Sequence, residues 1–210
     1  MTTEPPLPLV LASGSPRRRQ LLSRAGVEFE VIPADIPELQ REGEAPRAFA
    51  ERLAGEKALA VAQRVGPAPR RWVLGADTIV VLGDAVLGKP DDPEHAVQLL
   101  SRLVGRRHRV ITGVALVDSE GLRSEGLSVT SEVSMHPASA DEIRSYVATG
   151  ESLDKAGAYA LQGEGRRFVD RVEGSESNVI GLPLAATLEL LAESAGLTPG
   201  SASAGRAESA

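Results

Sequence analysis

One carboxylate lies inside an apolar run near the middle of the chain. Asp77 and Thr78 interrupt residues 73–82, whose other members are aliphatic residues and one glycine. An unpaired carboxylate in an apolar setting costs several kcal/mol or shifts its pKa, so a carboxylate there usually has a cationic partner, a metal ion or a catalytic task. Asp77 is therefore the first candidate for a functional residue.

Three consecutive arginines open a helix near the N-terminus. Ser15 and Pro16 follow a short apolar segment, residues 7–12, and are typical of a helix N-cap and first turn. Arginines 17–19 then place positive charge at the positive end of the helix dipole, which costs roughly 0.3–1 kcal/mol for each exposed arginine. A phosphate bound there would turn this cost into attraction. A solvated basic turn is the alternative.

Three other features could contribute to a polar site. Asp35 and Glu38 lie on a proline-broken loop and could hold a divalent cation, or could be ordinary surface acids. Lys57 falls on the apolar arc of a helix predicted over residues 46–65, where it either contacts a phosphate or extends past its neighbours to solvent. Residues 153–165 are polar and glycine-rich, so this loop can approach a ligand with its backbone.

The elements that would position these residues alternate between strands and helices. Buried or half-buried strands are predicted over residues 7–12, 29–32, 72–82, 85–87, 110–117 and 127–135. Helices are predicted after Ser15, over 46–65, after Asp92, after Ser139 and over 184–195. Residues 106–109, Arg-Arg-His-Arg, are expected to form a solvated loop. This alternation predicts a mixed α/β domain.

Length and composition limit the domain organisation. The chain has 210 residues, 42% of them hydrophobic and 25% charged, which suits one domain with a sizeable core. We expect this domain to span residues 8–197. Residues 1–7 and 198–210 are expected to be disordered tails, because they consist mostly of polar residues, proline, glycine and alanine.

Charge and cysteine content exclude several classes of function. Lys and Arg number 23 and Asp and Glu 29, a net charge of −6, which argues against a general nucleic-acid or acidic-membrane binder. No cysteine is present and the three histidines have no ligand-like spacing, which argues against a structural zinc or stable iron site. No apolar run reaches about 20 residues and no signal peptide is recognisable, so a cytoplasmic protein is expected.

Four stretches together resemble the Maf family of nucleoside triphosphate pyrophosphatases. The resemblance covers about residues 8–195. The stretches are LASGSPRR at 11–18, GADT at 75–78 with GKP at 88–90, DKAGAY at 154–159 with QG at 162–163, and VIGLP at 179–183. Each stretch alone is a weak signal, whereas four in this order and spacing are specific.

The resemblance implies a fold and an activity. The fold would be like that of inosine-triphosphate pyrophosphatases, a single α/β domain with an elongated mixed sheet flanked by helices and a cleft beside the sheet, often as a homodimer. The activity would be hydrolysis of a nucleoside triphosphate to the monophosphate and pyrophosphate with a divalent metal, Mg²⁺ or Mn²⁺. The wording of the motifs looks like the branch that prefers dTTP and UTP, with modified pyrimidine nucleotides as further candidates.

The resemblance also implies roles for particular residues. Asp77 matches the catalytic acidic position, described as the proton acceptor, and Glu38 matches an acidic position near the metal. The positions linked to substrate choice are Arg17, Thr78 and Gln162. The positions lining the triphosphate site are Ser13, Arg18, Lys57 and Lys89.

Two other functions compete with this interpretation. A nucleotide-binding regulator of septum formation and cell division would bind without turnover, but such a protein has no need of a carboxylate facing a polyanion. A phosphatase with an aspartate nucleophile is disfavoured because residue 79, two positions after Asp77, is isoleucine rather than a second acid. Thiol catalysis is excluded by the lack of cysteine, and the scattered histidines disfavour imidazole catalysis.

Overall fold

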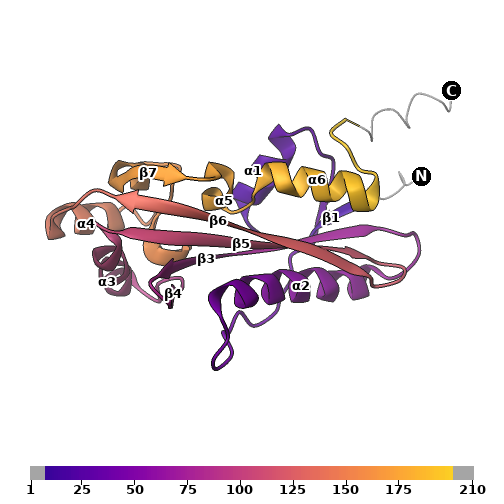
Figure 1. The fold of residues 1–210 in the computed structure, drawn as a ribbon, viewed down its shortest axis with the longest axis horizontal. Coiled ribbons are helices and arrows are strands. Elements are labelled where there is room, and N and C mark those ends of the chain that lie inside the picture. The colour runs from indigo at the N-terminus through magenta and orange to yellow at the C-terminus, as the bar shows by residue number, and fades with distance from the viewer. Residues whose placement is uncertain (1–7, 201–210) are drawn as a thin grey trace.

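A long mixed β-sheet runs through the part of the chain that the computed structural model describes, residues 8–200 (Figure 1). The sheet order is β2-β1-β3-β5-β6-β7, with β4 paired to β3. Strand β1 is parallel to β2 and β3, and the other pairs are antiparallel. The strands are β1 Leu9–Leu11, β2 Glu30–Val31, β3 Trp72–Leu82, β4 Ala85–Leu87, β5 Arg107–Asp118, β6 Ser124–Met135 and β7 Val169–Glu173.

Helices cover both faces of this sheet. Helix α2 packs on one face, α1, α5 and α6 lie on the other, and α3 and α4 lie at the end that carries β4 and β7 (Figure 1). The α-helices are α1 Pro16–Arg24, α2 Pro46–Val65, α3 Pro93–Leu103, α4 Ala140–Val147, α5 Glu176–Ile180 and α6 Leu184–Ala195. Of two 3₁₀ helices, η1 Ala156–Ala158 lies in the glycine-rich loop and η2 Glu164–Phe168 begins at its end. None of the helices in residues 8–200 is long and apolar enough to span a bilayer.

Two glycines set the distance between α2 and the sheet. A Cβ on Gly75 of β3 would lie 2.2 Å from the carbonyl oxygen of Ala54, and a Cβ on Gly113 of β5 would lie 2.4 Å from that of Ala50. Both oxygens belong to α2. Only glycine therefore allows the helix to lie this close to β3 and β5, which fixes its position along β3 next to Asp77.

The sequence predicts most elements but misplaces the start of β5. Arg107 and His108 belong to β5, because they pair with Ser134 and Val133 of β6, and do not form the expected solvated loop. His108 is buried, and its Nε2 lies 2.8 Å from the hydroxyl of Tyr159. Burial lowers the pKa of His108 to about 4, so its ring is neutral at neutral pH.

The ends of the chain bear on the predicted domain limits. Residues 1–7 and 201–210, where tails are predicted, lie outside the described residues. Residues 198–200 are described, and the N–H of Gly200 donates to the carbonyl oxygen of Gly26 at 3.1 Å. The described structure therefore continues past the predicted domain end at 197, and its last residue, Gly200, contacts the turn after α1.

Candidate active site

A cleft of about 710 Å³ opens at one edge of β3. On this edge β1 pairs with residues 72–74 and β4 with residues 80–82. Residues 75–79 have no strand partner there within the described chain, so side chains from both faces of the sheet reach the same opening. The sequence-predicted residues that line it are Ser13, Arg17, Arg18, Glu38, Lys57, Asp77, Thr78, Lys89 and Gln162.

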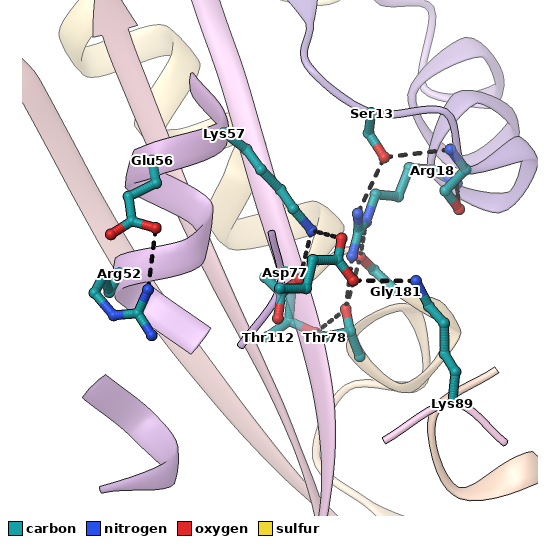
Figure 2. A network of polar contacts seen from close by, with 12 residues as sticks. Ser13, Arg18, Arg52, Glu56, Lys57, Asp77, Thr78, Lys89, Thr112 and Gly181 are labelled. Atoms are coloured by element: carbon teal, nitrogen blue, oxygen red, sulfur yellow. Dashed lines mark hydrogen bonds and ion pairs between the residues drawn. The ribbon is translucent and has the colours of Figure 1, made fainter. Parts of the chain in front are cut away.

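Asp77 faces α2 and is paired with Lys57 (Figure 2). Alternate residues of a strand point to the same face, so Asp77 faces α2 as Gly75 does. The Nζ atom of Lys57 lies 2.6 Å from Oδ1 of Asp77, and both side chains are only 8% exposed. Lys57 thus does not extend to solvent. It supplies the cationic partner that the buried carboxylate requires, while Oδ2 of Asp77 makes no hydrogen bond to the described residues.

Glu38 shares this lysine. Its Oε1 lies 2.5 Å from Nζ of Lys57, and its Oε2 lies 3.1 Å from Nζ of Lys89. Burial opposes ionisation of Glu38, but the hydrogen bond and charge of Lys57, together with Lys89, hold its pKa below the usual value. Asp35, the other acid of the loop, is exposed and lies outside the cleft lining. The loop therefore contributes one carboxylate to the site.

The carboxylates of the cleft are the candidate ligands for the expected divalent metal ion. Within residues 8–200 no group of three or more Asp, Glu, His or Cys side chains could hold a metal ion by itself. Asp77 and Glu38 nevertheless face one ammonium group. Mg²⁺ is commonly held by one or two carboxylates together with substrate phosphates, so this donor set fits a cation that binds together with a phosphate-bearing ligand.

Arg18 is a buried centre of hydrogen bonds on the opposite face of β3 (Figure 2). Its guanidinium donates to the carbonyl oxygen of Gly181 at 2.8 Å, to Oγ of Ser13 at 3.0 Å and to Oγ1 of Thr78 at 3.1 Å. Burial lowers the pKa of Arg18, against the charges of Asp77 and Glu38. Because a guanidinium has five N–H donors, two are left for a ligand.

The network continues from Thr78 into the core through residues that the sequence did not single out. Oγ1 of Thr78 lies 2.9 Å from Oγ1 of Thr112, which donates to the backbone oxygen of Asn178 at 3.1 Å. Nδ2 of Asn178 donates to Val110 O and Ser131 Oγ, both at 3.0 Å. Thr112 carries the signal that revealed Asp77, a polar residue inside an apolar strand. Asn178 carries no comparable signal, because its segment is polar.

Arg17, unlike Arg18, is half-buried and makes one ion pair across the cleft mouth. Its Nη1 lies 3.3 Å from Oδ2 of Asp154. Lys155, which lines the cleft but was not assigned from the sequence, donates to the other Asp154 oxygen at 2.5 Å. The side chain of Gln162 is exposed at the cleft and makes no hydrogen bond to the described residues, so its carboxamide is free to meet a ligand.

These contacts predict different stabilities for two neighbouring arginine variants. Arg18→Ala removes two buried and one partly buried charge-assisted hydrogen bonds and is expected to lower the free energy of unfolding by about 2–4 kcal/mol. Arg17→Ala removes an exposed ion pair and is expected to cost less than about 1 kcal/mol. Urea denaturation of the two variants measures the difference, and equal losses would contradict this description of Arg18.

Sequence comparisons relate the chain to known proteins. The family described as "Maf-like protein" matches residues 8–194. The chain belongs to the Maf family. Over 189 residues it is 53% identical to the "dTTP/UTP pyrophosphatase" of Myxococcus xanthus, covering 90% of this chain and 93% of that protein. It is 50% identical to the enzyme of the same name from Geobacter sulfurreducens, covering 86% and 93% of the two chains.

A solved structure supports the fold of this Maf protein. A HAM1 protein from Coxiella burnetii has a TM-score of 0.50 and 18% identity, covering 89% of this chain and 98% of the other. At this identity the likeness concerns the fold alone, and it confirms the predicted α/β domain with a long mixed sheet flanked by helices. The roles of the cleft residues rest on the contacts described above.

Proposed function

We propose that the chain hydrolyses dTTP and UTP to the nucleoside monophosphate and pyrophosphate. The observation that carries this proposal is Asp77, a carboxylate fixed by a buried lysine in a cleft that also holds Arg17, Arg18, Lys89 and Lys155. A base beside a cluster of cations suits attack by water on a polyphosphate. The names of the relatives that are about 50% identical point to the same substrates.

Asp77 accepts a proton from the attacking water in this mechanism. The oxygen of that water forms a bond to the α-phosphorus, the bond from the α-phosphorus to the bridging oxygen breaks, and pyrophosphate leaves. Lys57 binds Oδ1 of Asp77, so the orientation of the carboxylate is set and its second oxygen is available to the water. General bases positioned in this way contribute about 10²–10⁴ to the rate.

The remaining cations bind the triphosphate. Arg18 offers two unused N–H donors, and Arg17 and Lys89 exchange their exposed carboxylate partners for phosphate oxygens. Glu38 and Asp77 would hold a Mg²⁺ or Mn²⁺ ion that enters with the nucleotide. When bound, that ion neutralises charge on the phosphates and on the leaving pyrophosphate.

Gln162 is the residue best suited to recognise the nucleobase of the substrate. Uracil and thymine present carbonyl oxygens beside an N–H, and a carboxamide offers a matching donor and acceptor. The oxygen of Thr78 already contacts Arg18, Gly181 and Thr112. Thr78 thus influences substrate choice by holding Arg18 and the Gly181 turn rather than by contacting the base.

A panel of nucleoside triphosphates tests the proposal. Each ribo- and deoxyribonucleotide is incubated with the protein and Mg²⁺ or Mn²⁺, with an EDTA control, and pyrophosphate and orthophosphate are measured separately. The proposal expects pyrophosphate, fastest from dTTP and UTP. Tight binding without turnover would support the regulator of cell division instead, and orthophosphate as the sole product would support a phosphatase.

A further inference from the structure

The carboxylate of Glu151 accepts hydrogen bonds from the end of the glycine-rich loop that carries Gln162. Oε1 of Glu151 accepts hydrogen bonds from the hydroxyl of Tyr146 and from the N–H of Gly165, both at 3.0 Å. Oε2 accepts from the N–H of Glu164, also at 3.0 Å. Burial opposes its ionisation, but the two backbone N–H groups hold the pKa of Glu151 below its usual value. The group is therefore an ionised acceptor at neutral pH.

The loop is shaped to receive this carboxylate. Gly163, next to Gln162, has a φ of +90°, and a Cβ there would lie 2.4 Å from Oε2 of Glu151. The hydroxyl of Tyr146 also accepts from the N–H of Ala160 at 3.2 Å. Glu151 and Tyr146 together therefore bind backbone groups on both sides of Gln162.

We propose that Glu151 is a positioning residue that holds the loop of residues 160–165 so that Gln162 faces the nucleotide base. This inference rests on the proposed function, because it assigns Glu151 an effect on substrate choice through Gln162. Glu151 itself is absent from the cleft lining of the described chain. Its removal should thus change which base is preferred more than it changes the chemical step at Asp77.

Glu151→Gln tests the proposal with little change in size. An amide has one oxygen, so at least one of the three donors loses its acceptor and faces an N–H₂ group. We expect faster backbone deuterium exchange over residues 160–165, by about tenfold. We also expect the ratio of kcat/KM for dTTP over dGTP to fall about tenfold, chiefly through a higher KM for dTTP.

Glu142→Gln provides the matched control. Glu142 accepts from the N–H and hydroxyl of Ser139 at the start of α4 and is exposed. Glutamine can also accept at this capping position, so the control removes a carboxylate charge on α4 without changing a contact to residues 160–165. It is expected to leave both the exchange of residues 160–165 and the dTTP to dGTP ratio unchanged.

A double variant tests whether Glu151 acts through Gln162. Gln162→Ala should lower the same ratio, and Glu151→Gln should add less than about twofold in the Gln162→Ala background. Unchanged exchange, an unchanged ratio or fully multiplicative effects would each overturn the inference. If the parent protein released no pyrophosphate from any nucleotide, the proposed function would fail, while the exchange comparison would still decide whether Glu151 holds the loop.

Discussion

Asp77→Asn is expected to lower kcat for pyrophosphate release from dTTP by about 10²–10⁴-fold, the range that a positioned general base contributes. The amide keeps the size of the side chain and can still accept from Lys57, but it cannot take a proton from water. Lys57 also keeps Glu38 as a partner at 2.5 Å. The variant should therefore fold and bind nucleotide. Pyrophosphate release measured under saturating dTTP gives the comparison.

The control for this variant is nucleotide affinity. Calorimetric titration with a non-hydrolysable dTTP analogue should give similar dissociation constants for the parent and the Asn variant when divalent metal is left out, because Asp77 is also a proposed ligand of the metal ion. A loss of kcat of less than about tenfold, a change in barrier of only about 1.4 kcal/mol, would show that Asp77 is not the base.

Lys57→Met is expected to lower kcat/KM for dTTP by about 10²–10³-fold. Removing one preorganised electrostatic contact from an active site typically has an effect of this size. Methionine preserves most of the side-chain volume while removing the ammonium group that both Asp77 and Glu38 contact. Two carboxylates then face the triphosphate without their shared cation. Steady-state kinetics with dTTP and UTP measure the effect.

Lys89→Met is the matched control for this loss of charge. The Lys89 side chain is 59% exposed and pairs only with Glu38 among the described residues. Its removal is expected to cost about tenfold or less, mainly through a higher KM. Equal losses in the two variants would contradict the distinction between buried Lys57, which orients the general base Asp77, and exposed Lys89, which binds phosphate.

Local signals were sufficient to predict most elements of the fold. Pro46 and Gly66 mark the ends of α2, and the capping box of Ser139 and Glu142 marks the start of α4, because each signal acts within a few residues. Helix α5 was missed, since a five-residue helix in a polar segment has no apolar period. The early start of β5 depends on pairing with β6, which local sequence does not reveal.

In the candidate site, too, the sequence predicted single residues but not the contacts between them. Asp77 was predicted from the cost of a carboxylate in an apolar strand. Its partner Lys57 was predicted as a lysine among apolar neighbours and, from the family resemblance, as a residue lining the triphosphate site, but not as the partner of Asp77. Their contact depends on the close packing of α2 on Gly75, a long-range feature. The structure likewise separates Arg17 from Arg18: neighbours in sequence, they differ because only Arg18 turns into the core.

Hydrolysis of dTTP in H₂¹⁸O tests the central claim most directly. If water activated by Asp77 attacks the α-phosphorus, the heavy oxygen will appear in dTMP, the pyrophosphate will be unlabelled, and Asp77→Asn will suppress both products together. Mass spectrometry of the two products distinguishes the possibilities. Label in pyrophosphate or in orthophosphate, or labelled dTMP formed at the parental rate by the Asn variant, would contradict the account.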